Sequence, residues 1–378
     1  MSQLPAAVDV VVAGAGPTGL TLAAFLNAGG ADVVLLDKAA EGAGTSRAAV
    51  VHARTLEVLE GLDVTAELVK RGLITRSFTV RDRDRVLLTV PFAGLPTVHP
   101  YTLMIPQNVT EEVLLARLRA LGGQVHRPYE VTGVAQDETG ATVTTSTGES
   151  VRARYVVGAD GMHSVIRERS GIGFTGAGYT QPFVLADVGL DTELPGDEVQ
   201  LFLSAAGLVV VAPLPGGRHR IVATVDEAPE HPDAADVQAL LDARGPRRAP
   251  AVVRDVEWSS RFRVHHRIAG HYRAGRIFLA GDAAHVHSPA GGQGMNIGIQ
   301  DAAELARRIL DGTEDGYESA RRPVAEGVVT MTDRMTRAAT VRNPVARAVR
   351  DTALAVAGRR GSVRRALAMR LSELSTDR

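Results

Sequence analysis

Gly14-Ala15-Gly16-Pro17-Thr18-Gly19 is the stretch that decides the fold, because of what lies on either side of it. The run before it, Val8–Ala13, is continuously apolar, which is typical of a strand buried on both faces. The segment after it, Thr18–Ala28, has the character of a helix, and Gly29-Gly30 ends that helix. A second buried strand is predicted over Ala31–Asp37. Together these segments predict one strand–helix–strand unit.

The three glycines of this loop have distinct expected roles. Gly14 permits the tight turn, Gly16 lets the backbone approach a pyrophosphate at the helix N-terminus, and Gly19 lets helix and strand pack closely. Asp37 ends the second strand 23 positions after Gly14, where an acid can bond to a ribose hydroxyl. The context favours a dinucleotide site over a glycine turn without a ligand.

Two further motifs follow predicted strands. Gly158-Ala159-Asp160-Gly161 ends a strand predicted over Val151–Ala159, and taken alone it is only a turn. Gly281-Asp282 follows a strand predicted over Arg276–Ala280, and a carboxylate there can accept hydrogen bonds from a polyol. The glycine-rich stretch up to Asn296 then opens a helix, whose N-terminal N–H groups favour negative charge.

His285 and His287 lie within the third motif and are chemically suited to acid–base work. No partner for either is visible in the sequence, so a structural role is the favoured interpretation. The helix that follows is predicted to place Ala302, Leu305, Ala306, Ile309 and Leu310 on one face. A further helix is predicted over Val109–Leu121.

From about residue 182 to residue 264 the pattern changes to short strands. They are predicted at Val199–Leu203, Leu208–Ala212 and Arg220–Val225, with a turn at Pro215-Gly216-Gly217. This pattern predicts an antiparallel block inserted between α/β segments.

Composition limits the classes of function. A chain of 378 residues suggests about two domains, and a formal net charge of −1 favours neither nucleic acid nor a membrane surface as a partner. No apolar run reaches the ~20 residues of a membrane helix, and no signal peptide is expected. The absence of cysteine excludes disulfides, thiolate metal sites and cysteine nucleophiles, and no metal site is predicted. A cytoplasmic enzyme fits best.

Taken together, the motifs resemble those of the class A flavoprotein monooxygenases, which have the p-hydroxybenzoate hydroxylase fold. The likeness is greatest to the actinomycete aromatic polyketide hydroxylases. The matching segments are Val11–Gly19, Ser46–Glu57, Ile105-Pro106-Gln107, Val157–Ser164 with Arg167, and Arg276–Asp301.

The resemblance implies an α/β fold with a Rossmann-type FAD-binding domain, an inserted antiparallel β-sheet substrate domain and a C-terminal helical tail. The FAD-binding domain is expected to be discontinuous, over residues 1–75, 102–180 and 268–335. The substrate domain is expected over residues 76–101 and 181–267. The tail, over residues 336–378, is arginine-rich; a basic binding patch is one reading of it, and solvated surface helices are the favoured one.

The resemblance also implies which residues bind FAD. The expected contacts run from the pyrophosphate and the adenosine ribose to the ribityl chain and the flavin ring. The residues are Gly14, Gly16, Pro17, Thr18, Gly19, Asp37, Lys38, Arg47, Gln107, Asp160, Asp282, Pro289, Gly292, Gly294, Met295 and Asn296.

The family's reaction implies that transiently bound NADPH reduces the flavin and that dioxygen adds to it. The resulting flavin hydroperoxide then hydroxylates an aromatic small molecule, of which polyketides are one class. Baeyer–Villiger oxygenation and a flavin-dependent reductase remain alternatives on the same scaffold, as does a non-catalytic flavin-binding protein. NADH in place of NADPH also stays open. A halogenase is disfavoured, because Trp258 is the only tryptophan.

No catalytic residue is singled out by the sequence. The candidate bases are Tyr101, Tyr179, His219, His265 and His266. Four aromatic residues are candidates to line a substrate pocket, with plain core the favoured role for each: Phe92, Phe183, Phe202 and Phe262. The polyketide hydroxylases continue into a thioredoxin-like domain near the point where this chain stops, so either a monomer or a homodimer is expected.

Overall fold

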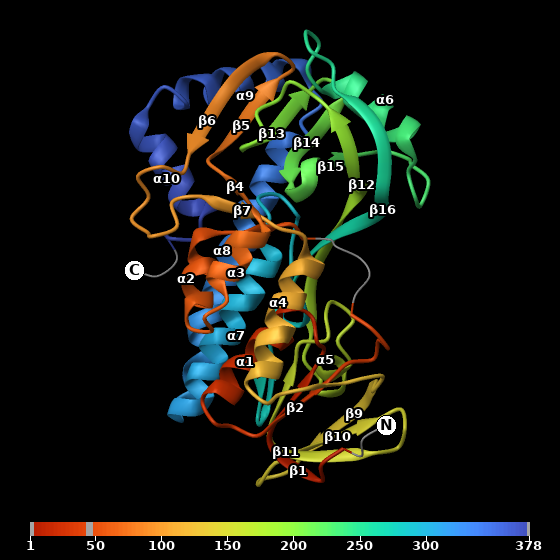
Figure 1. The fold of residues 1–378 in the computed structure, drawn as a ribbon, viewed down its shortest axis with the longest axis vertical. Coiled ribbons are helices and arrows are strands. Elements are labelled where there is room, and N and C mark those ends of the chain that lie inside the picture. Colours follow the sequence, from red (N-terminus) through yellow and green to blue (C-terminus); the bar gives the residue numbers. More distant parts are fainter. Residues whose placement is uncertain (1–3, 43–47, 376–378) are drawn as a thin grey trace.

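The computed structural model describes residues 4–42 and 48–375, which form two eight-stranded sheets joined by two long strands (Figure 1). The first sheet has the order β17-β18-β11-β1-β2-β8, and a β9–β10 hairpin extends it from β11. Its strands are β1 (Ala7–Ala13), β2 (Val33–Leu36), β8 (Val125–His126), β9 (Val131–Gln136), β10 (Ala141–Thr145), β11 (Ser150–Gly158), β17 (Arg273–Ala274) and β18 (Ile277–Leu279).

The middle of the first sheet is parallel and buried on both faces. Strands β18, β11, β1, β2 and β8 pair in parallel, and Val10–Val12 at its centre are fully buried. Helix α1 (Pro17–Ala28) packs between α4 (Gln107–Ala120) and α7 (Gly294–Asp311). The continuous apolar run before the first glycine loop is therefore a central parallel strand, as predicted.

Short helices and a small third sheet surround this core. The helices are α2 (Ala53–Glu60), α3 (Thr65–Arg71) and α5 (Val165–Arg169), with 3₁₀ turns η2 (Gly281–Ala283) and η3 (Glu314–Gly316). The third sheet has the order β3-β7-β4, from strands β3 (Val50–Val51), β7 (Thr102–Met104) and β4 (Leu73–Thr75). Ala49 and Met104 pack against Ala212 and Leu214, which joins this region to the second sheet.

The second sheet has the order β19-β16-β12-β15-β14-β13-β5-β6. Its strands are β5 (Ser77–Asp82), β6 (Arg85–Pro91), β12 (Phe174–Asp191), β13 (Glu198–Ser204), β14 (Gly207–Leu214), β15 (Arg218–Thr224), β16 (Val252–Ala269) and β19 (His285–Val286), with the turn η1 (Pro215–Gly217) between β14 and β15. The predicted antiparallel block is present, with one exception among its pairings: β5 pairs with β13 in parallel. The β5–β6 hairpin arrives from more than a hundred residues earlier, so no local turn fixes its direction.

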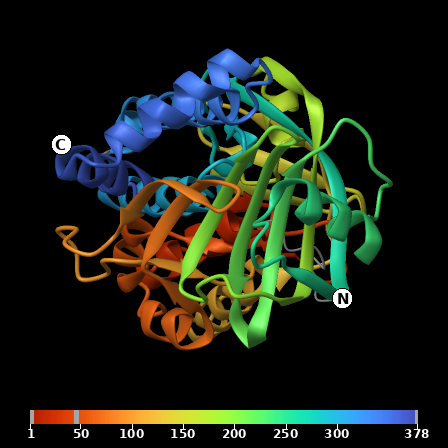
Figure 2. The same ribbon diagram turned by 90° about the horizontal axis from the view of Figure 1, so that it is seen from above.

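The two faces of the second sheet are covered differently. Phe202, Val209 and Val211 pack under α6 (Ala234–Arg244) on one face. Because side chains alternate along a strand, the neighbouring Leu201 and Leu203 point to the other face. That second face looks toward the C-terminal helices α8 (Tyr317–Ala339), α9 (Pro344–Ala357) and α10 (Gly361–Leu371), which lie along one side of the sheet (Figure 2).

The predicted elements around the motifs are present, with ends shifted by one or two residues. On the predicted apolar face of α7, Leu310 is the member that stays partly open, at 42% exposed. It lies in the last turn of the helix, where its methyl groups cover Gly29 at the end of α1. The expected boundaries near residues 180 and 267 fall inside β12 and β16, the long strands that run between the two sheets.

The predicted α/β class, with an additional sheet and a helical C-terminal tail, is confirmed. No helix in the described residues combines the length and the apolar character needed to cross a bilayer.

We expect Phe202→Ala to lower the free energy of unfolding by about 3–5 kcal/mol, because it empties a fully buried site between the second sheet and α6. Urea unfolding followed by circular dichroism measures the loss. Val252→Ala is the control, since Val252 is 53% exposed and should cost little. Equal losses in the two variants would contradict the placement of this core.

Candidate functional site

The predicted motifs stand side by side at one edge of the first sheet. Parallel pairing aligns Leu36, Ala13, Gly158 and Leu279 across β2, β1, β11 and β18. Each of these is the last residue of its strand, so the following loops start at the same level. Three strand spacings of about 4.8 Å give a row roughly 14 Å long. The carboxyl ends of parallel strands are where open α/β sheets bind ligands.

The glycine loop after β1 depends on close backbone contacts. Gly14 has φ +99°, and a Cβ there would lie 2.3 Å from the carbonyl oxygen of Ala159. A Cβ on Gly19 would lie 1.8 Å from the carbonyl oxygen of Gly14. A Cβ on Gly16 would meet nothing within 4 Å, so this glycine keeps a surface of the loop open. Gly14 and Gly19 are thus required by the fold, whereas Gly16 is not.

Asp37 supports the glycine loop from the next strand. Its Oδ2 accepts a hydrogen bond of 2.8 Å from the N–H of Ala15, and its Oδ1 accepts one of 2.8 Å from Ala39. Arg127 Nη2 lies 3.9 Å from the same carboxylate. Lys38 is exposed beside it. The acid is therefore at the end of the row, in contact with the loop that would cradle a pyrophosphate.

Asp160 holds the turn after β11. Its Oδ2 accepts a hydrogen bond of 3.2 Å from the N–H of Ile166 at the start of α5. Burial raises the pKa of Asp160, although hydrogen bonds from Ser164 and from backbone N–H groups oppose this. Its Oδ1 is buried and has no hydrogen-bond partner among the described residues. An acceptor without a partner at this position suits a ligand hydroxyl.

Arg167 joins the second motif to the third. Its guanidinium donates to the carbonyl oxygen of Ala283 at 2.9 Å and to that of Met162 at 2.8 Å, and it lies over the ring of Phe174. This buried side chain therefore fixes the turn of the Asp160 motif against the Asp282 motif.

The third motif approaches the first loop through two more glycines. A Cβ on Gly281 would lie 2.5 Å from Thr18 Oγ1, and one on Gly298 would lie 2.4 Å from the same atom. Thr18 is thus enclosed between the turn that carries Asp282 and the first turns of α7. The side chain of Asp282 itself is exposed at the edge of the sheet.

The loop before α7 is held by Asn296. Its Oδ1 accepts from the N–H of His52 at 2.8 Å, and its Nδ2 donates to the carbonyl oxygens of Val50 and Gly292. The side chain of Asn296 is therefore occupied with holding the loop, and it is fully buried. No side chain caps the N-terminus of α7, so the positive end of the helix faces the loop formed by Pro289–Gln293.

Of the two predicted histidines of the third motif, His285 is buried and His287 is partly buried. His285 Nε2 lies 2.6 Å from Asp301 Oδ2, while Arg321 Nε donates to Asp301 Oδ1 at 2.7 Å. Burial would raise the pKa of Asp301, but His285 and Arg321 lower it below its usual value. Because Asp301 also accepts from the N–H of Gly281 at 3.2 Å, this cluster supports the turn behind Asp282. It gives His285 a structural role, and its partner was invisible in the sequence.

His287 and His52 lie on either side of the same loop. Burial lowers the pKa of each to about 4, against the smaller opposing effect of a backbone hydrogen bond, so both imidazoles are neutral at neutral pH. His287 Nδ1 lies 2.9 Å from the carbonyl oxygen of Ser288, which assigns the proton to Nδ1. Its Nε2 has no partner among the described residues and lies beside Gly294. His52 was not singled out by sequence reasoning.

The other predicted contacts occupy the edge of this region. Gln107 begins α4, where its Oε1 accepts from the N–H of Ala48 at 3.2 Å and its Nε2 donates to Glu111 at 2.8 Å. Met295 is half-buried against the core of the first sheet. Arg47 lies outside the described residues.

The row fits a flavin dinucleotide in three ways. Gly16 leaves space at a helix N-terminus, Asp160 offers a buried acceptor, and α7 directs an uncapped N-terminus at the far end of the row. An FAD binding domain model matches residues 7–332 of this chain. The chain belongs to the FAD-dependent monooxygenase family. It is therefore an enzyme that uses FAD.

Known relatives support this membership. The 6-methylpretetramide 4-monooxygenase of Streptomyces rimosus is 39% identical over 355 residues, a match that covers 89% of this chain and 63% of that protein. The structure of the anhydrotetracycline hydroxylase of Streptomyces rimosus superposes with a TM-score of 0.80 at 32% identity, covering 98% of this chain and 76% of that one. The p-nitrophenol 4-monooxygenase of Pseudomonas putida gives 0.87 at 26% identity, covering 99% and 100%. This chain thus spans about two thirds of the length of the first of these relatives.

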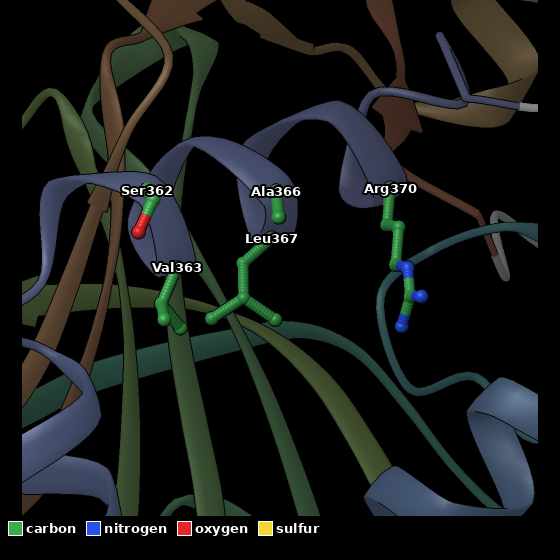
Figure 3. A pocket seen from close by; sticks show the side chains of 5 residues that line it. All are labelled: Ser362, Val363, Ala366, Leu367 and Arg370. Atoms are coloured by element: carbon green, nitrogen blue, oxygen red, sulfur yellow. The ribbon is translucent and has the colours of Figure 1, made fainter.

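A cavity of about 300 Å³ lies along α10 (Figure 3). Its lining combines apolar side chains with one cation: Ser362, Val363, Ala366, Leu367 and Arg370. Leu367 packs against the cluster formed by the second sheet, so the cavity borders the space between that sheet and the C-terminal helices. A second cavity, of about 510 Å³, is lined by Pro182, Asp226, Glu227, Arg261, Phe262 and Arg263. Neither lining includes a residue of the loops that follow β2, β1, β11 and β18.

The structure separates the aromatic candidates. Phe202 packs under α6, on the face of the sheet away from the C-terminal helices, so it cannot line a pocket on the other face. Phe92 and Phe183 are core, and Phe262 stacks on Phe183 with ring centres 5.9 Å apart and contributes to the second cavity.

The candidate bases do not come together at one place. Tyr101 Oη lies 3.1 Å from His99 Nδ1, and burial raises its pKa. Burial lowers the pKa of His219 and of His265. His265 and His266 are neighbours on β16, and the side chain of Tyr179 lies outside the described part of the structure. The geometry therefore selects none of them.

The different roles of Gly16 and Gly19 can be tested by placing a methyl group at each position, since only the one at Gly19 would overlap the backbone. We expect Gly16→Ala to leave the unfolding free energy nearly unchanged and to weaken FAD binding roughly tenfold or more, because a methyl group blocks backbone hydrogen bonds to a charged pyrophosphate. Gly19→Ala adds the same methyl group where it overlaps a carbonyl oxygen, so it should destabilise the fold by about 1–3 kcal/mol or more. Thermal unfolding without FAD and flavin fluorescence titration distinguish the two effects. Similar behaviour of the two variants would refute this division of roles.

The buried charge cluster makes a second prediction. Asp301→Ala should destabilise the protein by about 3–5 kcal/mol, since it leaves the guanidinium of Arg321 buried without its carboxylate. Asp315→Ala, which removes an exposed carboxylate of a surface pair with Arg273, should cost under about 1 kcal/mol. Chemical denaturation of both variants provides the measurement, and a small loss in Asp301→Ala would show that the cluster does not support the fold.

Proposed function

We propose that the protein is an FAD-dependent, NAD(P)H-consuming monooxygenase that hydroxylates an aromatic small molecule of the polyketide type. One observation carries the proposal: the first glycine loop, Asp37, Asp160 and Asp282 follow four neighbouring parallel strands whose last residues are in register. Such a row matches an extended dinucleotide, with its adenosine end at β2 and its flavin end at the start of α7. By their names, the relatives described above act on 6-methylpretetramide, anhydrotetracycline and p-nitrophenol.

We assign the FAD contacts along this row. Gly14–Gly19 would hold the pyrophosphate, Asp37 and Lys38 the adenosine ribose, and Asp160 and Asp282 the ribityl chain. Pro289, Gly292, Gly294, Met295 and Gln107 would contact the ring end, and Arg47 remains a candidate contact outside the described residues. Asn296 acts through the loop that it holds. The proposed FAD-binding domain comprises residues 1–75, 102–180 and 268–335, and the proposed substrate domain comprises residues 76–101 and 181–267.

Bound FAD would supply the redox chemistry: it would be reduced by a transient nicotinamide cofactor and would then activate dioxygen. The protein's residues orient and shield it. The positive end of α7 would stabilise negative charge on a reduced ring. His52 and His287 are neutral at neutral pH, so they bring no positive charge, and Nε2 of His287 would be an acceptor for a ligand beside Gly294.

The substrate is proposed to bind between the second sheet and the C-terminal helices. Partly buried Leu201, Val210, Val222 and Phe262 offer an apolar wall on the sheet, and the cavity along α10 lies in the same region. A flat aromatic molecule gains most from such a surface. An apolar enclosure also keeps water from the reacting atoms.

The comparisons do not favour Baeyer–Villiger oxygenation or a flavin-dependent reductase, since the names of the relatives described above mention neither activity. Oxygen uptake separates either oxygenation from a reductase, and the structure of the product separates hydroxylation from Baeyer–Villiger insertion. A hydroxylase adds one oxygen atom from dioxygen without ring expansion, and a reductase consumes none.

The decisive experiment is turnover by the purified yellow protein in air. With p-nitrophenol or an anthracene-type polyphenol as probe, we expect oxidation of NADPH or NADH, uptake of dioxygen, and one labelled oxygen atom in the product from isotopically labelled dioxygen. Asp282→Ala should lower FAD occupancy, while Glu138→Ala, which removes an exposed acid away from the row, should not. A yellow protein that neither oxidises NAD(P)H nor consumes oxygen with any phenol would overturn the proposal.

A further inference from the structure

The segment that ends α10 is bound to the loop at the flavin end of the site. Gln293, in that loop, donates through Nε2 to the carbonyl oxygen of Leu371 at 3.1 Å. The N–H of Arg54, in the first turn of α2, donates to the carbonyl oxygen of Ser372 at 3.2 Å. Leu371 Cδ2 also lies against Gly291. Residues from the far end of the sequence thus contact both sides of the proposed ring-binding loop.

Glu373 completes this contact with a buried side chain. Its Oε2 accepts hydrogen bonds from Gln300 Nε2, on α7, and from Thr55 Oγ1, on α2, the latter at 3.4 Å. Gln300 also donates to Thr55 at 3.1 Å, so the three side chains form a closed group. Gln293 immediately precedes α7 and Gln300 lies seven residues later on that helix, and both side chains donate to the tail. The carboxyl group therefore joins α2, α7 and the end of α10.

The backbone at Glu373 is also unusual. Its φ is +61°, in the left-handed region, and the N–H of Leu374 donates to the carbonyl oxygen of Met369 at 3.0 Å. This is the C-terminal cap in which glycine is the usual residue, because a Cβ is unfavourable there. A glutamate at this position is explained if its carboxyl group does something that glycine could not.

We propose that Glu373 is a positioning residue for the flavin: by docking the tail on α2 and α7, it fixes the loop Gly291–Asn296 that receives the ring. The inference rests on the proposed FAD site. It assigns to the C-terminal helix a role in cofactor binding in addition to its place beside the substrate region.

The protonation of Glu373 gives this contact a pH dependence. The charged groups acting on it are Arg321 on α8 and Asp301 on α7, with His285 on the far side of Asp301. Thr55 and Arg54 lie on α2, and the neutral His52 precedes that helix; the N–H of Arg54 donates to Ser372, beside Glu373. Arg321 is also paired with Asp301. Burial raises the pKa of Glu373 to about 8, against smaller lowering effects of Gln300, Arg321 and Thr55.

The sign of the dependence follows from linkage. A carboxyl group on an undocked tail loses its proton near its ordinary pKa of 4.5, whereas the docked group keeps it up to about pH 8. Docking is therefore firmest in acid, weakens as the pH rises between these two values, and changes no further above them. Glutamine at this position imitates the protonated acid at every pH.

The test compares Glu373→Gln, Glu373→Ala and the wild-type chain at pH 6 and pH 8.5. The measurements are the FAD dissociation constant and hydrogen exchange of the amides of residues 291–296. In the wild type we expect the dissociation constant to rise roughly fivefold between the two pH values, with faster exchange in the loop. Glu373→Gln should show neither change, and Glu373→Ala should bind FAD weakly at both. Glu326→Gln, which removes an exposed carboxylate paired with Arg322 on α8, is the control and should behave as wild type.

Two results would overturn the inference: FAD binding by Glu373→Ala as tight as in the wild type, or the same pH dependence in Glu373→Gln and the wild type. If Glu373→Ala does not fold, the comparison of Glu373→Gln with wild type decides alone. If none of the chains binds FAD, the proposed function fails, while the exchange rates of the loop still report whether Glu373 holds it.

Discussion

The close approach of backbones at the strand ends is the constraint on which the rest of the structure depends. Gly14 lies against Ala159, Gly19 lies against Gly14, and the Thr18 hydroxyl lies where a Cβ of Gly281 or Gly298 would be. These contacts bring segments more than 260 residues apart in the sequence to one edge of the sheet. Once they are made, the carboxylates that follow the neighbouring strands have little freedom in position. The geometry of the site thus follows from the register of the strands and from glycines at the points of contact, where a side chain would not fit.

Much of this arrangement could be predicted from the sequence, because its signals are local. The apolar run Val8–Ala13 indicates a central strand, and the glycine spacing after it indicates the turn and the helix. Asp160 and Asp282 each follow a recognisable buried strand. Parallel strands expose their carboxyl ends at the same edge, so the sequence already places these acids together, although it gives no distances.

What could not be predicted depends on pairs that are distant in the sequence. Asp301 lies on a helix whose pattern indicates only a buried face, and nothing marks it as the partner of His285 and Arg321. Asn296 was expected to touch the flavin ring, but its amide holds Val50, His52 and Gly292 together. The parallel pairing of β5 with β13 could not be predicted either, because the two strands are distant in the sequence and no turn connects them. Periodicity shows that a side chain is buried but does not identify its partner.

The region behind the loop Pro289–Gln293 is held by buried polar contacts. His52, Asp301, Arg321, Gln300 and Glu373 are all buried, and each has a hydrogen-bond partner. Buried polar groups are costly when left unpaired, so only one arrangement of the loop satisfies all of them. Apolar packing would tolerate small shifts of the loop, whereas hydrogen bonds of fixed length and direction do not. A ring that must meet both a substrate and dioxygen needs such a fixed position. This requirement gives a physical reason for charged and amide side chains to occupy the interior at this point of the fold.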